Sequence, residues 1–326
     1  MKLQLSKSRK GRNMGKYVAC FDIGGTFIKY AMIDEQGMVH EQGKITTPVQ
    51  NQKKEILYRI CEVIYEFEKS YKIHSVGVSS CGIIDNIKGE VLYSANISGY
   101  SGTKIADYIY SETGYVASIE NDVRSACLGE MWKGVGQGKE HIVLITLGTG
   151  IGSGIIINGK ILQGVKGLAG ELGHMIIVHN GEKCSCGGEG CYERYASTSA
   201  LIRQYKEASK IQGLEIGTIT GEEIIERMYR GERLAKDVYE QFLQYVVVGL
   251  VNITYIFNPE LIIIGGGITE QGEPFLKQIQ ERFHDKIMDI YQNKVEIALA
   301  SLHNDAGVYG ACYVALNQCE EKSMNI

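Results

Sequence analysis

The residues with the clearest chemical pattern are a histidine and three cysteines spaced H-x9-C-x-C-x4-C: His174, Cys184, Cys186 and Cys191. Zinc takes cysteine and histidine ligands in a tetrahedron, and the glycines between the last two cysteines allow a short loop to fold back around an ion. Because four protein ligands leave no open position, the pattern predicts a structural zinc loop over 174–193. His179 is an alternative fourth ligand, and three free surface thiols are the alternative interpretation of the cysteines.

Two carboxylates flank this cluster. Glu171 stands three residues before His174, and Glu193 stands two residues after Cys191. A metal ion between them would fix both side chains. Carboxylates held in this way suit bidentate recognition of sugar hydroxyls, because each offers two acceptor oxygens.

Two glycine-rich segments each separate a pair of apolar runs: D-I-G-G-T at 22–26 and G-T-G-I-G-S-G at 148–154. A bare backbone lets several N–H groups converge on phosphate oxygens, so both segments are interpreted as phosphate-binding hairpins. Asp22, just ahead of the first turn, can hold Mg²⁺ directly or through water. The residues expected to contact phosphate are Gly24, Gly25, Thr26, Lys29, Gly148, Thr149, Gly150 and Gly152.

A third glycine turn, formed by Gly265, Gly266 and Gly267, follows a predicted strand over 261–264. Ligands gather at the carboxyl ends of strands in α/β sheets, so this turn is a further candidate for ligand binding. By contrast, G-x-x-x-x-G-K at 154–160 is rejected as a P-loop, because Ile161 stands where Ser or Thr is required and the segment lies within a hairpin.

Asp122 ends the tripeptide E-N-D at 120–122, which stands between a predicted strand and a predicted helix. The structural interpretation is a helix N-cap. The functional interpretation is a base for a sugar hydroxyl, because phosphoryl transfer needs chiefly positioning, a metal ion and one proton acceptor.

The elements that must position these residues follow from apolar periodicity. Predicted strands lie at 17–21, 28–33, 38–46, 74–80, 116–119, 142–147, 155–158 and 261–264. Predicted helices lie at 53–70, 103–112, 123–133, 233–257 and 307–316. Strand, glycine turn and strand occur twice, which indicates an internal duplication of one phosphate-binding hairpin.

We therefore expect two α/β domains with a cleft between them. The N-terminal lobe would cover 15–124 and be joined by a C-terminal helix over 308–322. The C-terminal lobe would cover 125–307 and carry the zinc loop. Residues 1–14 are expected to form a loose basic tail without the apolar centre of a signal peptide, and Met14 is an alternative start.

Composition narrows the functional class. The chain has 326 residues, is 44% hydrophobic and carries a net charge of −4, so no general basic field favours a nucleic acid or a membrane surface as partner. No apolar run reaches the roughly 18 residues of a membrane helix. Nine cysteines, an odd number, favour a reducing compartment, and we expect a cytoplasmic protein.

Taken together, the motifs resemble those of the ROK family (repressors, open reading frames, kinases), within the superfamily of hexokinase and actin. They occur in the family's order from about residue 17 to about 318: D-I-G-G-T at 22–26, E-N-D at 120–122, L-G-T-G-I-G at 147–152, G-E-L-G-H at 170–174 and C-S-C-G-G-E-G-C-Y-E at 184–193. The zinc segment is nearly diagnostic of that family.

This resemblance implies a two-lobed, actin-like ATPase fold of the ribonuclease H-like type, closing over ATP and a hexose. Asp122 would be the catalytic base for the 6-hydroxyl of the sugar, and the turn at 265–267 would lie on the nucleotide-base side. The residues expected to bind sugar hydroxyls are Asn96, Asn121, Glu171, His174 and Glu193, with His174 also ligating zinc. Family members are commonly homodimers or homotetramers.

The segment around Asn96 departs from the family pattern. Glucokinase-like members usually have N-L-P-G-W, whereas Ser98 and Tyr100 replace the proline and tryptophan here. Glucose is favoured as the acceptor, and N-acetylmannosamine and a phosphorylated β-glucoside are alternatives. A sugar-responsive regulator without kinase activity is the other class of function, but only 16 residues precede Tyr17, which is too short for a DNA-binding domain.

Overall fold

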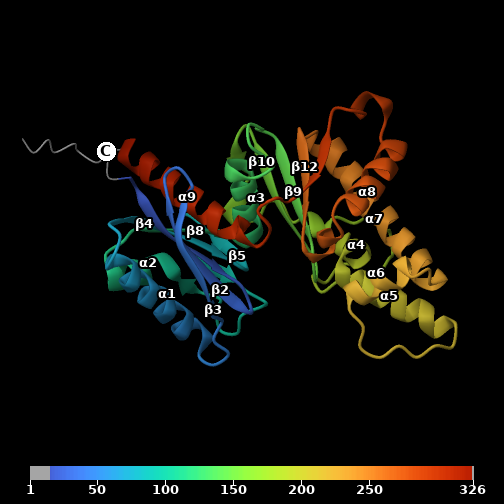
Figure 1. Cartoon of the computed structure of the whole chain (residues 1–326), viewed down its shortest axis with the longest axis horizontal. Helices are drawn as coiled ribbons and strands as arrows, with labels where there is room; N and C mark the ends of the chain where they lie inside the picture. Colours follow the sequence, from blue (N-terminus) through green and yellow to red (C-terminus); the bar gives the residue numbers. More distant parts are fainter. Residues whose placement is uncertain (1–14, 325–326) are drawn as a thin grey trace, which may run out of the picture.

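Two five-stranded sheets stand at the centres of two lobes (Figure 1). The computed structural model describes residues 15–324, so the predicted basic tail, 1–14, lies outside the described residues. The first sheet contains β1 (Tyr17–Ile23), β2 (Phe27–Asp34), β3 (Val39–Thr46), β4 (Ile73–Ser80) and β8 (Ala117–Asn121). The second contains β9 (Ile142–Leu147), β10 (Ile151–Ile157), β11 (Lys160–Ile161), β12 (Leu261–Gly265) and β13 (Glu296–Leu299).

The two sheets repeat one topology. Their strand orders are β3-β2-β1-β4-β8 and β11-β10-β9-β12-β13. In each, the first strand pairs antiparallel with the strand of its hairpin and parallel with the next central strand. The α/β class and the duplicated hairpin predicted from the sequence are thus confirmed. A smaller sheet of β5 (Ile83–Asp85), β6 (Glu90–Tyr93) and β7 (Thr103–Lys104) joins the first lobe.

Helices cover both faces of each sheet. They are α1 (Gln52–Glu68), α2 (Ile105–Thr113), α3 (Asp122–Lys133), α4 (Glu193–Ala196), α5 (Thr198–Ile211), α6 (Gly221–Tyr229), α7 (Arg233–Phe257), α8 (Glu273–Lys286) and α9 (Ala306–Met324). Successive side chains of β1 point to opposite faces of the first sheet and so pack in two different hydrophobic layers. Phe21 and Ile23 pack in the core with α1 and α2, whereas Val18 and Cys20 pack against α9.

The helices that follow the last strand of each repeat are exchanged between the lobes. Helix α3 follows β8 of the first sheet but packs on β9 and β10 of the second, through Cys127 and Leu128. Helix α9 follows β13 of the second sheet but packs on β1, β4 and β8 of the first. In Figure 1, α3 lies between the lobes and α9 runs along the first sheet.

The two exchanged helices cross at very short distance. A Cβ atom at Gly129 would collide with the backbone oxygen of Ala306, and one at Gly310 would collide with that of Ser125. The crossing therefore depends on the absence of side chains at two glycines, one in each helix.

The second glycine segment differs from the sequence prediction. The expected turn covered 148–154, but β10 already begins at Ile151, so Gly152 and Gly154 are strand residues. A Cβ at either would lie 2.6 Å from a carbon atom of α3, at Val123 and Cys127 respectively. These glycines let α3 approach the sheet, which explains why a strand carries so many of them. No helix in the described part of the chain is long and apolar enough to span a membrane.

Candidate active site

The carboxyl ends of three neighbouring parallel strands bring two acidic side chains together. Asp22 stands near the end of β1, Ser79 is its register partner on β4, and Asp122 directly follows β8. Ser79 Oγ donates a hydrogen bond of 2.7 Å to Asp22 Oδ1. Parallel strands end at one edge of a sheet, so the E-N-D segment and the first glycine hairpin meet there.

Asp122 has a perturbed acidity. Burial raises its pKa to about 6, and the nearby charge of Asp22 adds to this rise. Hydrogen bonds from Val123 N, at 2.9 Å, and Asn121 Nδ2, at 2.8 Å, oppose the shift without cancelling it. The carboxylate is therefore ionised at neutral pH but more basic than an ordinary aspartate, which suits a proton acceptor.

Asn121, not Asp122, caps helix α3. The Asn121 Oδ1 atom accepts hydrogen bonds from Val123 N (3.0 Å) and Arg124 N (3.1 Å). Its Nδ2 atom donates to Gly82 O at 3.0 Å and to Asp122 Oδ1. The interpretation of Asp122 as N-cap is thus wrong, because the neighbouring amide supplies the cap and leaves Asp122 as the first helical residue.

The Asp22 carboxylate is partly buried, with Ser79, Lys29 and Gly307 close around it. Burial raises its pKa, while the hydrogen bond from Ser79 and the charge of Lys29 lower it. Lys29 Nζ is 3.9 Å from Asp22 Oδ2 and donates to Asn304 O at 2.5 Å, which joins the first hairpin to the segment before α9. A Cβ at Gly307 would come 2.6 Å from Asp22 Cγ, so the glycine makes room for the carboxylate.

The predicted zinc ligands converge. The ligand atoms of His174, Cys184, Cys186 and Cys191 all lie within 4.8 Å of one another. Cys184 Sγ is 3.6 Å from His174 Nδ1, and Cys186 Sγ is 3.6 Å from Cys191 Sγ. Tetrahedral Zn–S bonds of about 2.3 Å separate two ligand atoms by roughly 3.7 Å, so the donor set fits zinc. The rival ligand His179 is exposed and stands outside this group.

The loop that carries these ligands is anchored at its far end. Isolated bridges pair Ile176 with Cys191 and Lys183 with Glu189. Tyr192, which directly follows Cys191, is fully buried and donates a hydrogen bond of 2.8 Å to Val246 O of α7. Its ring occupies the space where a side chain at Gly249 would stand.

Glu193 connects the zinc cluster with the second glycine hairpin. Its Oε1 atom is 3.2 Å from Cys184 Sγ and 3.8 Å from His174 Nδ1. A Cβ at Gly150 would come 2.6 Å from Glu193 Oε2. Glu193, a predicted sugar ligand, and the predicted phosphate-binding turn at Gly150 therefore lie next to each other in the second lobe. Glu171, the other predicted carboxylate ligand, stands just before the 3-10 turn over 172–174 and is exposed.

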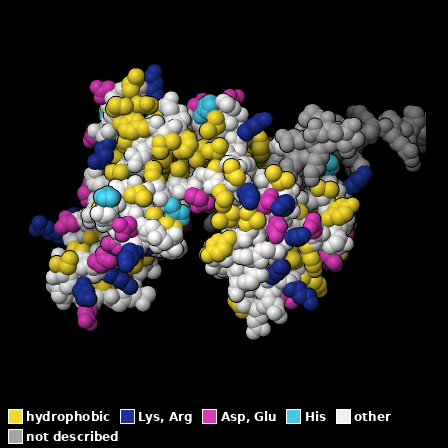
Figure 2. Space-filling view, turned by 180° about the vertical axis from the view of Figure 1, so that it is seen from behind, with side chains coloured by type: hydrophobic (Ala, Val, Ile, Leu, Met, Phe, Trp, Pro, Cys, Tyr) yellow, Lys and Arg dark blue, Asp and Glu magenta, His cyan; other side chains and the backbone are white. Residues whose placement is uncertain are grey.

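The third glycine turn borders two cavities. A Cβ at Gly266 would collide with the backbone of Leu147, so this turn lies directly beside the second hairpin. A cavity of about 150 Å³ is lined by Thr146, the three glycines and Asn304 among others. A neighbouring cavity of about 330 Å³ shares Gly267 and Glu270 with it and extends between α6 and the turn after β12. Figure 2 shows the surface hollowed between the two lobes.

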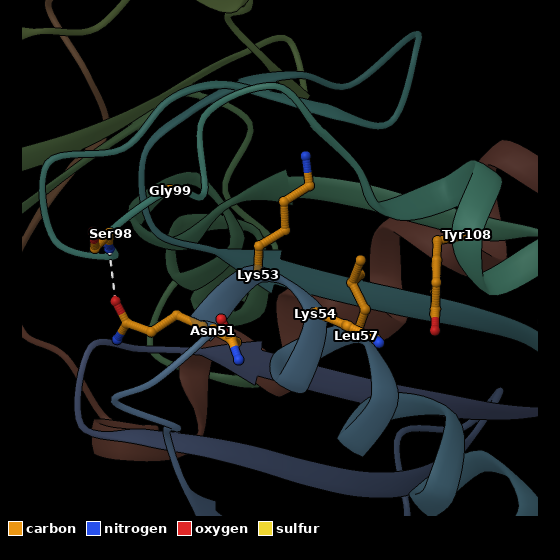
Figure 3. Close-up of a pocket in the computed structure, with 8 residues that line it drawn as sticks. Asn51, Lys53, Lys54, Leu57, Ser98, Gly99 and Tyr108 are labelled. Carbon is orange, nitrogen blue, oxygen red and sulfur yellow. Dashed lines mark hydrogen bonds between the residues drawn. The ribbon is translucent and has the colours of Figure 1, made fainter.

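Asn96 lies opposite the first hairpin, where a Cβ at Gly25 would be 4.0 Å from Asn96 O. Its loop is held from α1, since Ser98 N donates a hydrogen bond of 2.7 Å to Gln52 Oε1 (Figure 3). A cavity of about 510 Å³ opens beside this contact. Tyr100, which replaces the family's tryptophan, is fully buried, and its hydroxyl lies 3.2 Å from Ser80 Oγ.

The structure thus groups the predicted residues in two sets. Asp22, Asn96, Asn121 and Asp122 belong to the first lobe, while Glu171, His174 and Glu193 belong to the second. Sequence reasoning missed Ser79 and Gly307, which shape the surroundings of Asp22. It also quoted Glu120 without giving it a role, although a charged residue inside a buried strand could have signalled one.

Known proteins resemble this chain in sequence and in fold. The model of the ROK family matches residues 18–318. A glucokinase of Thermotoga maritima is 33% identical over 301 residues, covering 90% of this chain and 95% of that protein. A ROK glucokinase from Streptomyces griseus, solved with glucose and AMPPNP, superposes with a TM-score of 0.75 at 30% identity, covering 92% of this chain and 99% of that one.

Regulators are also among the relatives. A xylose repressor of Caldicellulosiruptor bescii is 29% identical over 295 residues, covering 85% of this chain and 73% of that protein. Both hairpins, the His–Cys cluster and the E-N-D segment lie within the residues that the family model matches. Because this match spans most of the sequence, the chain belongs to the ROK family.

Proposed function

We propose that the protein is an ATP-dependent hexose kinase that phosphorylates the 6-hydroxyl of an aldohexose, with glucose as the favoured acceptor. The observation that carries this proposal is Asp122, whose carboxylate is held at the start of α3 with a pKa of about 6. It rests also on the likeness to glucokinases in sequence and in structure.

The reaction needs one proton acceptor and two anchored substrates. Asp122 would accept the proton of the sugar hydroxyl as its oxygen attacks the γ-phosphorus, and the bond from that phosphorus to the leaving oxygen of ADP breaks. Asn96, Glu171, His174 and Glu193 would hold the other hydroxyls. Asn121 would chiefly orient Asp122, since its amide already makes four hydrogen bonds.

The nucleotide would lie along the three glycine turns. Backbone N–H groups at 25–26 and 149–150 would contact phosphate oxygens, because Gly24 N and Gly148 N already donate within their own turns. The base would lie toward the cavities beside 265–267. Asp22 would hold Mg²⁺, which supplies charge neutralisation on the phosphates when bound. His174, Cys184, Cys186 and Cys191 would hold a structural zinc ion that keeps Glu193 and the ring of His174 in place.

The similarity to a xylose repressor supports a second candidate, a sugar-binding regulator. A coupled assay of ADP release with Mg-ATP, run over glucose, N-acetylmannosamine, N-acetylglucosamine, mannose, fructose and cellobiose, distinguishes the two. Saturable turnover with glucose supports the proposal in full, and turnover with another sugar corrects only the acceptor. Sugar binding by calorimetry without turnover on any sugar favours the regulator.

A further inference from the structure

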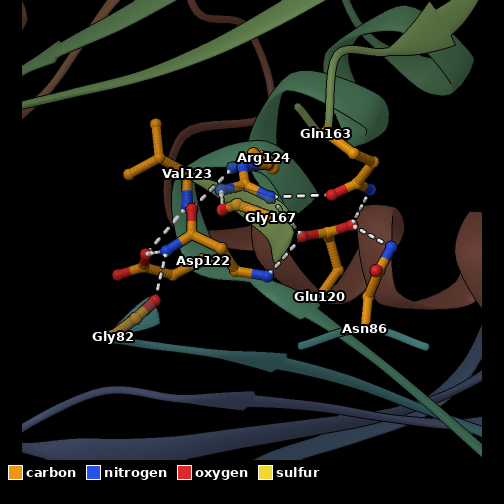
Figure 4. A network of polar contacts seen from close by, with 9 residues as sticks. Gly82, Asn86, Glu120, Asp122, Val123, Arg124, Gln163 and Gly167 are labelled. Carbon is orange, nitrogen blue, oxygen red and sulfur yellow. Dashed lines mark hydrogen bonds and ion pairs between the residues drawn. The ribbon is translucent and has the colours of Figure 1, made fainter. Parts of the chain in front are cut away.

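A buried polar cluster lies directly behind the proposed base (Figure 4). Glu120 and Arg124 are 1% and 4% exposed, and Arg124 Nη1 is 3.5 Å from Glu120 Oε1. Gln163 joins both: its Nε2 donates to Glu120 Oε2 at 2.7 Å, and its Oε1 accepts from Arg124 Nη1 at 2.8 Å. Arg124 Nη2 also donates to Gly167 O.

The cluster is complete on the carboxylate side. Glu120 Oε1 accepts from Asn121 N at 2.8 Å, and Glu120 Oε2 accepts a second, longer bond of 3.4 Å from Asn86 Nδ2. Burying a charged pair is costly, and replacing one by apolar side chains is often neutral or stabilising. A fully bonded network in a low-dielectric interior is rigid, so the arrangement suits the fixing of geometry better than the gain of stability.

The partners come from the two repeats of the fold, and the bond between Glu120 of β8 and Gln163 joins one lobe to the other. Glu120 precedes and Arg124 follows Asn121 and Asp122 in the sequence, so the two residues hold both ends of the turn that carries the base. Gln163 and Gly167 belong to the segment that leaves β11 of the second sheet. This segment reaches the first lobe, where a Cβ at Gly167 would come 2.5 Å from the backbone oxygen of Ile84 in β5.

The same segment continues to a predicted sugar ligand. Ala169 N donates to Gln163 O at 3.1 Å, which closes the segment into a compact turn. Ser153 Oγ of β10 donates to Gly170 O and accepts from Leu172 N at 3.1 Å, so the residues on both sides of Glu171 are fixed. Hydrogen bonds, together with the peptide link between Ala169 and Gly170, therefore connect the base-bearing turn with the residues on both sides of Glu171.

We propose that Gln163 and Arg124 are positioning residues that fasten segment 163–171 of the second lobe to the turn carrying Asp122, and so keep the base and the sugar ligand Glu171 in one alignment. This inference rests on the proposed kinase function for its effect on turnover. The physical connection itself can be tested without that function.

The test uses Gln163→Leu, which keeps the volume but removes both hydrogen bonds, and Asn86→Ala as the matched control. Asn86 touches the same oxygen of Glu120 but belongs to the first lobe, so it does not link the lobes. Both variants are measured in the full chain for amide hydrogen exchange, melting temperature and steady-state kinetics.

We expect Gln163→Leu to accelerate amide exchange over 168–174 and to lower kcat about ten- to a hundredfold, because a displacement near 1 Å can cost that much. The KM for ATP should stay unchanged, and Asn86→Ala should change kcat less than about threefold. Unchanged exchange in Gln163→Leu overturns the proposal whatever the activity. Equal loss of kcat in both variants overturns it as well, since that result indicates a purely structural role. A wild-type protein without turnover would instead refute the kinase function and leave the exchange experiment decisive for the connection.

Discussion

Replacing the proposed base should make the protein less active and more stable at the same time. Asp122 has a pKa of about 6, against an ordinary value of 3.8, because its charged form is buried beside Asp22. A rise of about two pKa units corresponds to ~3 kcal/mol of unfavourable free energy in the charged form. An asparagine at this position keeps the acceptor oxygen for Val123 N and avoids that cost.

The sign follows from linkage. The folded pKa lies above the unfolded one, so the carboxylate destabilises the native state fully above pH 6, and this penalty disappears as the pH falls from about 6 to about 4. Asp122→Asn should therefore raise the free energy of unfolding at pH 8 by up to ~3 kcal/mol, and the gain should vanish at pH 4. Turnover of the variant should fall roughly a hundred- to ten-thousandfold.

Thermal unfolding at pH 8 and pH 4, together with ADP release between pH 5 and 8, measures both effects. The kcat/KM of the wild type should fall tenfold per pH unit below about pH 6. The Asp122→Asn variant should still bind sugar and ATP. Near-normal turnover in Asp122→Asn would remove Asp122 as the base. A variant that is no more stable at pH 8 than the wild type would refute the desolvation argument.

Three further perturbations test other parts of the site. Cys184→Ser should release the metal and lower both the melting temperature and the sugar affinity, as measured by elemental analysis, thermal unfolding and calorimetry; full activity in a metal-free wild type would contradict a structural zinc ion. Gly150→Ala should displace Glu193, whose Oε2 atom lies 2.6 Å from the new methyl group, and raise the KM for sugar about tenfold, while an unchanged KM would separate this turn from sugar binding. Gly310→Ala should cost about 1–3 kcal/mol in denaturant unfolding because its methyl group meets the backbone of Ser125, and unchanged stability would show that the helix crossing relaxes freely.

The sequence predicted the parts of the fold whose pattern is local. Helix α7 and strand β9 have the predicted bounds, because long apolar periodicity and a short β-branched run leave little ambiguity. The four predicted zinc ligands converge, as their close spacing in the sequence led us to expect. Whether the carboxylates, amides and glycines act as proposed stays a prediction.

What the sequence could not predict depends on packing between distant segments. Gly152 and Gly154 look like turn residues by type, yet they serve the approach of α3 to β10. Asp122 and Asn121 are both good capping residues, and only the backbone conformation decides that Asn121 caps. Gln163 has no local signal at all, because its partners Glu120 and Arg124 come from the other repeat.

The exchange of α3 and α9 between the repeats has a consequence for biosynthesis. Val18, Cys20, Ala31 and Ile33 form an apolar face of the first sheet that α9 covers, with Trp132 of α3 also packed against it. The ribosome releases the strands of this sheet long before it releases α9. The apolar face that α9 covers in the folded protein is therefore exposed to water while the rest of the chain is synthesised. The lobe translated first is therefore expected to finish folding last, and its exposed sheet is the natural target for a chaperone during synthesis.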